Sequence, residues 1–224
     1  MAGRSSRRRR LNQNLLTDRR LAAELAGVTS PGDLVVELGA GSGALTIPIA
    51  RRARKVIAVE INSRMAERLT ARAAAEGLLD HIEIVVADLL DVRLPSEPYR
   101  VAANPPFAST TAMLRRLLDD PDRGPERADL IVQWGVACKR TSSPPTSVQS
   151  LTWAPWWLFD IQRRIPRRSF RPMPSVDAAW LTITKRTPPV LAPEMAPGFA
   201  HFARSWWAEK YGSGGPRGRS EPCS

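Results

Sequence analysis

The chain has 224 residues, of which 43% are hydrophobic, and its 33 Lys and Arg against 22 Asp and Glu leave a formal net charge of +11. This length fits one α/β domain with a small appendage, and no apolar run is long enough to cross a membrane. The two cysteines and two histidines are too few and too scattered to predict a disulfide framework or a metal site.

Arginines account for most of the positive charge and gather in two clusters. One lies at the start of the chain and the other late in it. Because the planar guanidinium group suits phosphate, two dense clusters favour a nucleic-acid partner. The arginine bias of a GC-rich genome is the alternative explanation. No apolar stretch follows the first arginines, so no secretory signal is predicted and we expect a cytoplasmic protein. The clusters are Arg4, Arg7, Arg8, Arg9 and Arg10, then Arg163, Arg164, Arg167, Arg168 and Arg171.

The chain begins with a basic arm, residues 1–10, that shows no helical periodicity. Thr17 and Asp18 are good residues for a helix start, and the pattern after them predicts a helix to about Ala26.

The stretch LVVELGAGSGA at positions 34–44 predicts a buried parallel strand, a glycine loop and the start of a helix. Glycines let a ligand approach the backbone, and a helix N-terminus adds N–H donors. Two cofactors fit. Gly39-x-Gly41-x-x-Ala, with Glu60 further on, matches the dinucleotide fingerprint. Glu37-x-Gly39-x-Gly41 also fits S-adenosylmethionine (SAM), which Glu37 favours because a carboxylate repels a pyrophosphate and suits an ammonium group.

Acidic residues end three successive predicted strands. Glu37 belongs to the first, Glu60 ends the strand 55–60, and Asp88 follows the strand 82–87. The carboxyl ends of parallel strands border one crevice, where ligands bind in open α/β sheets. In a nucleoside site, Glu60 can accept hydrogen bonds from both ribose hydroxyls and Asp88 can receive an adenine amino group.

The fourth predicted strand, 100–103, runs into Asn104-Pro105-Pro106-Phe107. The prolines stiffen the backbone, so the Asn104 amide oxygen and the Pro105 carbonyl can both accept from the amino group of a base. This arrangement aims the nitrogen lone pair at a methyl donor, and catalysis is then mainly positioning. Phe107 offers a ring on which a flipped-out base can stack. Asn104 and Phe107 are therefore the catalytic candidates.

The remaining elements are predicted from periodicity and composition. The four aromatic residues Trp153, Trp156, Trp157 and Phe159 begin a strand region and are more typical of a core than of a base-stacking platform. Phe199, Phe202 and Trp206 have the spacing of one helix face, in a helix that ends by Tyr211. The other predictions are helices over 66–76 and 110–118, a fifth strand over 128–134, a flexible Ser/Thr/Pro-rich loop over 141–150 that is either a lid or a plain surface loop, a basic loop over 165–176, and a last strand over 179–185 that closes the sheet.

The predicted fold class is α/β: a Rossmann-like, SAM-dependent methyltransferase sheet with helices on both faces and a short C-terminal helical appendage. The domain prediction is a basic arm over 1–10, a methyltransferase domain over 11–187, a reduced helical region over 188–211 and a disordered tail over 212–224.

Together these motifs resemble the rRNA adenine N6-methyltransferases over roughly residues 7–187, and within them the erythromycin-resistance (Erm) type of actinobacteria. The segments that carry the resemblance are Gln13-Asn14-Leu15-Leu16, Glu37-x-Gly39-x-Gly41, Glu60, Asp88, Asn104-Pro105-Pro106-Phe107, Gln133-Trp134 with Ala137-x-Lys139-Arg140, and Phe170 to Asp177.

The resemblance implies SAM as cofactor and N6-methylation, single or double, of one adenine in 23S rRNA, which blocks macrolide, lincosamide and streptogramin B binding. It implies that Asn14 and Leu16 hold the methionine end of SAM, with Gly39, Glu60, Asp88 and Asn104 completing the site. A monomer is expected. The chain departs from the family pattern in four places. Gly135 stands where the resemblance predicts an acid, and Leu15 stands where it predicts Phe. Ser143-Pro144-Pro145-Thr146 replaces a glycine-rich loop, and one C-terminal helix is predicted where about three are usual.

Four other functions are weighed against this one. The Gln133-Trp134 block argues, by resemblance, against a small-subunit rRNA adenine dimethyltransferase and a DNA adenine methyltransferase. The presence of Asn104 and all three acids argues against a catalytically impaired RNA-binding protein on the same fold. A nicotinamide oxidoreductase has no use for the segment 104–107.

Overall fold

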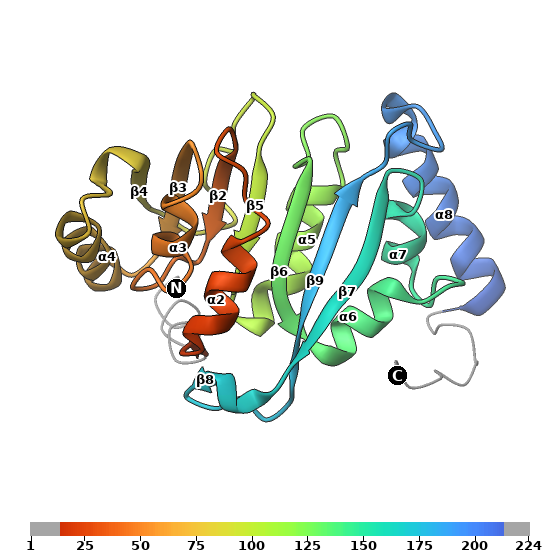
Figure 1. Ribbon diagram of the computed structural model, residues 1–224. Coiled ribbons are helices and arrows are strands. Elements are labelled where there is room, and N and C mark those ends of the chain that lie inside the picture. Colours follow the sequence, from red (N-terminus) through yellow and green to blue (C-terminus); the bar gives the residue numbers. More distant parts are fainter. Residues whose placement is uncertain (1–13, 213–224) are drawn as a thin grey trace, which may run out of the picture.

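The computed structural model describes residues 14–212, and a central seven-stranded sheet with helices on both faces organises them (Figure 1). This arrangement confirms the predicted α/β fold class. The predicted arm over 1–10 and residues 213–224 of the predicted tail over 212–224 lie outside the described residues. Within residues 14–212, no helix has the combined length and apolarity that a membrane span requires.

The strands have these bounds: β1 (Leu15–Leu16), β2 (Leu34–Leu38), β3 (Lys55–Glu60), β4 (Ile82–Val86), β5 (Arg100–Ala103), β6 (Arg127–Gln133), β7 (Trp157–Ile165), β8 (Phe170–Arg171) and β9 (Ala178–Lys185). The helices have these bounds: α2 (Arg19–Ala26), α3 (Thr46–Ala50), α4 (Ser63–Ala75), α5 (Thr110–Leu118), α6 (Trp134–Thr141), α7 (Val148–Trp153) and α8 (Ala196–Tyr211). Short 3-10 helices lie at Leu79–His81, Phe107–Ser109, Arg167–Ser169 and Pro193–Met195.

The strand order in the main sheet is β4-β3-β2-β5-β6-β9-β7. The pairs β2–β3, β3–β4, β2–β5 and β5–β6 are parallel, whereas β9 is antiparallel to both of its neighbours. The chain runs outward from β2 to β4 and then returns to the other side of β2 as β5. The order therefore reverses between β2 and β5, and open α/β sheets bind their ligands beyond the carboxyl ends of the strands at such a point.

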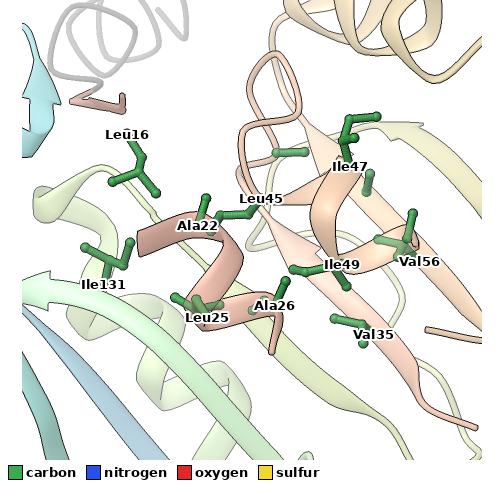
Figure 2. Close-up of a cluster of buried hydrophobic side chains, with 14 of the residues drawn as sticks. Leu16, Ala22, Leu25, Ala26, Val35, Leu45, Ile47, Ile49, Val56 and Ile131 are labelled. Atoms are coloured by element: carbon green, nitrogen blue, oxygen red, sulfur yellow. The ribbon is translucent and has the colours of Figure 1, made fainter. Parts of the chain in front are cut away.

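The continuous apolar run of β2 is explained by burial on both faces, since all five of its residues are buried. Leu34, Val36 and Leu38 pack in the cluster that contains residues of α5 and α7. Val35 faces the opposite side, where it joins the cluster that contains residues of α2 and α3 (Figure 2).

The predicted helix start at Asp18 is confirmed. Its carboxylate accepts a hydrogen bond from the Leu21 N–H at 3.0 Å, which is the N-cap interaction. The same bond is the main reason that the pKa of Asp18 lies below its usual value. Leu25 and Ala26 of this helix then pack in the cluster of Figure 2.

A two-stranded sheet joins the N-terminal segment to the late basic loop, which no local pattern predicted. Leu15 pairs with Arg171 and Leu16 with Phe170 in antiparallel register. Beside this pair, the N–H and the hydroxyl of Thr17 both donate to the Ser169 carbonyl, at 2.9 and 3.0 Å. The pairing fixes residues 14–16 over the carboxyl end of the main sheet.

In the segment 141–150, predicted as a flexible loop, residues 142–147 lie outside any helix, so the prediction was wrong only for the two ends. Helix α6 continues to Thr141 and α7 begins at Val148. The hydroxyl of Ser147 caps α7 by accepting from the Ser150 N–H at 3.2 Å. The buried Arg140 donates to the hydroxyls of Ser147 and Ser150, at 2.8 and 3.2 Å. The serines that indicated a loop thus serve as a cap and as partners of a buried guanidinium.

The tryptophans of the aromatic region belong to the core, as predicted. Trp153, Trp156 and Trp157 are at most 2% exposed, and the indole N–H of Trp153 donates to Asp119 at 2.7 Å. The prediction that the last strand closes the sheet was wrong, because β9 returns as a hairpin between β6 and β7 and leaves β7 at the edge.

Helix α8 ends at Tyr211 as predicted, but it buries a different face. Ala203 and Trp207 are buried, whereas Phe202 is 60% exposed and Trp206 is 37% exposed. Phe199 is the part of the predicted face that does pack, edge-on against Trp156 at 5.8 Å between ring centroids. Because Trp206 and Trp207 are adjacent, either of them can belong to the buried face of the helix. The small Ala203 side chain, which lies on the same face as Trp207, lets that face approach the core.

Gly43 tests how tightly the helices pack beside the glycine loop. Gly43→Ala is expected to lower the free energy of unfolding by about 2–4 kcal/mol, because φ is +88° and an added Cβ would lie 2.6 Å from the Cδ1 of the buried Leu69. Denaturant unfolding measures this change. Gly77→Ala is the matched control: its φ is +67° but its Cβ would meet open space, so only about 1 kcal/mol of backbone strain should remain. Equal losses in the two variants would show that the contact with Leu69 is relieved without cost.

Candidate active site

A pocket lies at the switch point of the sheet, beyond the carboxyl ends of β2, β3 and β5. Three segments far apart in the sequence build it: the β1 segment, the glycine loop and the segment after β5. Its lining residues are Asn14, Leu15, Leu16, Glu37, Gly39, Ala40, Gly41, Ser42, Ala44, Leu45, Glu60, Asn104 and Pro106. Of the predicted site residues, the structure brings together Asn14, Leu16, Gly39, Gly41, Glu60 and Asn104.

The glycine loop needs its glycines for conformation and for space. Gly39 and Gly41 have φ values of +87° and +57°, which other residues rarely adopt. A Cβ on Gly39 would lie 3.9 Å from the Asn104 carbonyl oxygen and from the Cα of Pro105. The loop therefore faces the segment after β5 across a gap that the missing side chain leaves open.

Glu60 braces the glycine loop, a role that sequence reasoning missed. The side chain is 1% exposed. Its Oε2 accepts from the Gly41 N–H and its Oε1 from the Asn62 N–H, both at 2.8 Å. Each carboxylate oxygen keeps a further lone pair for a ligand hydroxyl. The signal in the sequence was that a strand next to the one preceding the glycine loop also ends in an acid, which can reach the loop N–H groups.

Glu37 is a second buried carboxyl group in the pocket. It is 2% exposed, and its Oε2 has no hydrogen-bond partner within residues 14–212. Burial raises its pKa to about 8, and the nearby Glu60 carboxylate adds to the shift. Near neutral pH this group is therefore largely protonated in the free protein.

The raised pKa of Glu37 predicts a pH-dependent stability. Between about pH 5 and pH 8 the folded chain keeps a proton that the unfolded chain has released, so stability falls as pH rises through this window. Glu37→Gln removes the titrating group, so the variant should not lose stability in this way. Its free energy of unfolding relative to that of wild type should therefore rise from pH 5 to pH 8. Thermal unfolding across this range measures the effect. The exposed Glu67 provides a control as Glu67→Gln, and identical pH profiles for all three proteins would contradict the assigned pKa.

Asn104 is held by the N-terminal segment. Its Nδ2 donates to the backbone carbonyl of Asn14 at 3.0 Å. This bond assigns the orientation of the amide, so the Oδ1 atom is the acceptor that remains. The β1–β8 pairing thus positions a side chain of the pocket, although Asn14 contributes through its main chain.

Two predicted residues do not line the pocket. Asp88 is half-buried, and its Oδ1 accepts from the Leu90 N–H at 3.0 Å in the loop after β4. Phe107 is partly buried in the 3-10 helix before α5 and packs against the cluster of Figure 2. Their proposed contacts with adenine and with a target base stay predictions. In the part of the chain that the structure describes, no group of three or more His, Cys, Asp and Glu residues is arranged to hold a metal ion.

The sequence matches the family profile described as ribosomal RNA adenine dimethylase over residues 4–213. It is 35% identical over 188 residues to an rRNA adenine N-6-methyltransferase of Corynebacterium diphtheriae, covering 84% of this chain and 72% of that relative. It is 37% identical over 186 residues to the mycinamicin-resistance protein MyrB of Micromonospora griseorubida, covering 82% of this chain and 58% of that relative. The chain therefore spans less than two thirds of the length of the second relative.

Among solved structures, the 23S rRNA methyltransferase ErmE is similar to this chain with a TM-score of 0.76 and 30% sequence identity. The match covers 85% of this chain and 78% of that chain. Both the sequence and the fold thus lead to the same group of proteins.

Proposed function

This chain belongs to the ribosomal RNA adenine dimethylase family, and from that membership we propose that it transfers methyl groups from SAM to the N6 amino group of one adenine in 23S rRNA. The observation that carries the proposal is the Asn104 amide, which the Asn14 carbonyl orients at 3.0 Å beside a glycine-loop pocket. The names of the relatives support 23S rRNA as the target, since ErmE is a 23S rRNA methyltransferase and MyrB is a resistance protein. Resistance to macrolide, lincosamide and streptogramin B antibiotics follows from such a modification.

The residues of the pocket fit SAM better than they fit a dinucleotide. The Oε2 of Glu37 is buried without a partner within residues 14–212. The cationic ammonium group of a methionine moiety would favour the ionised form of this carboxyl group and donate a hydrogen bond to it. A pyrophosphate would instead meet the two carboxyl groups of Glu37 and Glu60. Asn14 and Leu16 would cover the methionine end, Gly39 and Gly41 would leave room for the backbone approach, and Glu60 would accept from the ribose hydroxyls.

When bound, SAM supplies an electrophilic methyl group on a sulfonium centre. The chain's own contribution is to hold the acceptor amine. Asn104 Oδ1 accepts a hydrogen bond from the adenine amino group, and the Pro105 carbonyl accepts the second, so the nitrogen lone pair points toward the pocket. The proton leaves the amine after transfer, and no strong base is required. Phe107, one residue beyond the pocket lining, would support the flipped base.

Methyl transfer from labelled SAM to deproteinised 23S rRNA, 16S rRNA and DNA tests the proposal. We expect label in 23S rRNA alone, at one adenine of the peptidyl-transferase region, located by primer extension and assigned as mono- or dimethyladenine by mass spectrometry of nucleosides. Label in 16S rRNA would identify a small-subunit dimethyltransferase instead. SAM binding without transfer to any of these substrates would point to an RNA-binding protein that has kept the fold.

A further inference from the structure

A shallow concavity lies beside the pocket, at the same end of the sheet. It is open to solvent and is built by the end of β6, the start of α6, the end of β7 and the residues just before β9. Its lining residues are Gln133, Trp134, Gly135, Val136, Arg164, Arg167, Ser175, Val176 and Asp177. Because β6 is parallel to β5 and pairs with it directly, this concavity and Asn104 lie at the same edge of neighbouring strands.

The floor of the concavity is a stacked pair. The guanidinium carbon of Arg164 lies 4.9 Å from the centroid of the half-buried Trp134 ring, in the geometry of a cation–π contact. The Arg164 side chain is nevertheless 59% exposed. Its guanidinium therefore has one face on the indole ring and the other toward solvent.

Asp177 holds this pair in place from the side. Its Oδ2 accepts from the Nε of Arg164 at 3.0 Å, and its Oδ1 accepts from the Arg167 N–H at 3.0 Å. Its carbonyl accepts from the Trp134 N–H, also at 3.0 Å. These bonds, that of the Arg167 N–H most of all, lower the pKa of Asp177, so the anchor stays ionised at neutral pH. Arg164 is thus ordered before any ligand arrives.

Two further features leave room for a ligand with a phosphate. The guanidinium of Arg167 makes no ion pair or hydrogen bond within residues 14–212, yet it lines the same concavity. Gly135 is exposed, and a Cβ there would meet nothing within 4 Å. The glycine therefore keeps the entrance open and free of the acid that the family resemblance predicts at this position.

We propose that this concavity is a nucleotide subsite, in which the base of an RNA residue flanking the target adenine stacks on the open face of Arg164 and its phosphate pairs with Arg167. Unpaired RNA bases stack on flat guanidinium groups. A guanidinium group that is ordered before binding loses less entropy when the base binds. Unpaired bases are the part of an RNA that a stacking site can select. The inference rests on the proposed function for the identity of the RNA, and it adds a determinant of substrate affinity outside the methyl-transfer pocket.

Arg164→Lys is the decisive variant, because lysine keeps the charge and can keep the ion pair with Asp177 but loses the flat stacking face. With a transcript of the peptidyl-transferase region of 23S rRNA, we expect KM for RNA to rise about tenfold, the loss of one stacked base. The kcat at saturating RNA and the Kd for SAM should stay within about twofold. The salt dependence of KM should not change, since no charge is lost.

Arg163→Lys is the matched control. Arg163 is the neighbouring position on β7 and forms an ion pair with Glu24 of α2, away from the concavity. The KM of the Arg163→Lys variant for RNA should stay within about twofold of the wild-type value. Gly135→Glu supplies an independent test, because a carboxylate in the open entrance should raise KM for RNA without changing the unfolding temperature. A fall in kcat with unchanged KM in Arg164→Lys, or equal effects in the two lysine variants, would overturn the subsite.

A fluorescence readout separates this inference from the proposed function. The same transcript is prepared with 2-aminopurine at each position flanking the target adenine in turn. We expect one position to be quenched on binding to wild type and to remain bright with Arg164→Lys. If wild type methylates 23S rRNA but no position shows this dependence, the subsite is wrong while the function stands. If quenching depends on Arg164 but no RNA is methylated, the subsite stands and the proposed reaction is wrong.

Discussion

Replacing Asn104 with alanine is expected to lower kcat by at least a hundred- to a thousandfold, the loss typical of one hydrogen-bonding group fixed in a reaction centre. The Oδ1 atom of Asn104 is the proposed acceptor for the target amino group, and its Nδ2 is anchored on the Asn14 carbonyl at 3.0 Å. Alanine removes both contacts but leaves the glycine loop and both buried carboxyl groups in place. Binding of SAM should therefore remain measurable by calorimetry, with a change of less than about tenfold.

Asn14→Ala is the control for the anchoring contact. Because Asn14 holds the Asn104 amide through its main-chain carbonyl, removing its side chain should leave kcat within a fewfold of wild type. A rise in the Kd for SAM in this variant would then report the contact with the methionine end that the resemblance implies. Normal turnover of Asn104→Ala would sink the proposed catalytic role.

Glu60→Ala should raise the Kd for SAM by about 10- to 150-fold, the value of one or two hydrogen bonds to a charged acceptor. Two roles are assigned to this residue, one proposed and one observed. It is proposed to accept from the ribose, and it also braces the backbone N–H groups of Gly41 and Asn62 at 2.8 Å each. Without the carboxylate, those two N–H donors lose their partner. Because Glu60 is only 1% exposed, water replaces the carboxylate poorly, and the variant should also unfold at a lower temperature.

A cofactor analogue separates the two functions of Glu60. The Kd of S-adenosylhomocysteine and that of its 2′-deoxy derivative are compared in wild type and in Glu60→Ala. If Glu60 holds the ribose, wild type should prefer the hydroxylated ligand and the variant should lose much of that preference. An unchanged preference would show that Glu60 only supports the loop. Glu67→Ala, which removes an exposed carboxylate from α4, should affect neither ligand.

The sequence by itself determined the parallel half of the sheet. The bounds of β2, β3 and β5 agree with the predicted strands at Leu34–Leu38, Lys55–Glu60 and Arg100–Ala103. These strands are buried or central, so they read as short apolar runs, and glycine, acid or proline residues end them abruptly. Because parallel strands meet at one edge, the same reading also brought Gly39, Glu60 and Asn104 to a single pocket.

Sequence patterns gave wrong predictions where the same residues fit two local structures equally well. On α8 both tryptophan positions fit a helical face, and only packing selected Trp207 over Trp206. The serines of residues 141–150 fit a loop or a helix cap, and the buried Arg140 decided for the cap. In both cases the intrinsic propensities of the residues are the same for the two alternatives. The outcome therefore depends on the packing partner, which the local sequence does not show.

Only the tertiary structure decided how the pocket is held together. The two-residue strands β1 and β8 are too short to leave a pattern in the sequence, yet their pairing places the Asn14 carbonyl against Asn104. The loop-bracing bonds of Glu60 and the clamp of Arg164 between Trp134 and Asp177 likewise join elements that are distant along the chain. Residue types and spacing predict which groups reach the carboxyl edge of a sheet, but contacts between distant segments depend on backbone register and on which lone pairs are already in use.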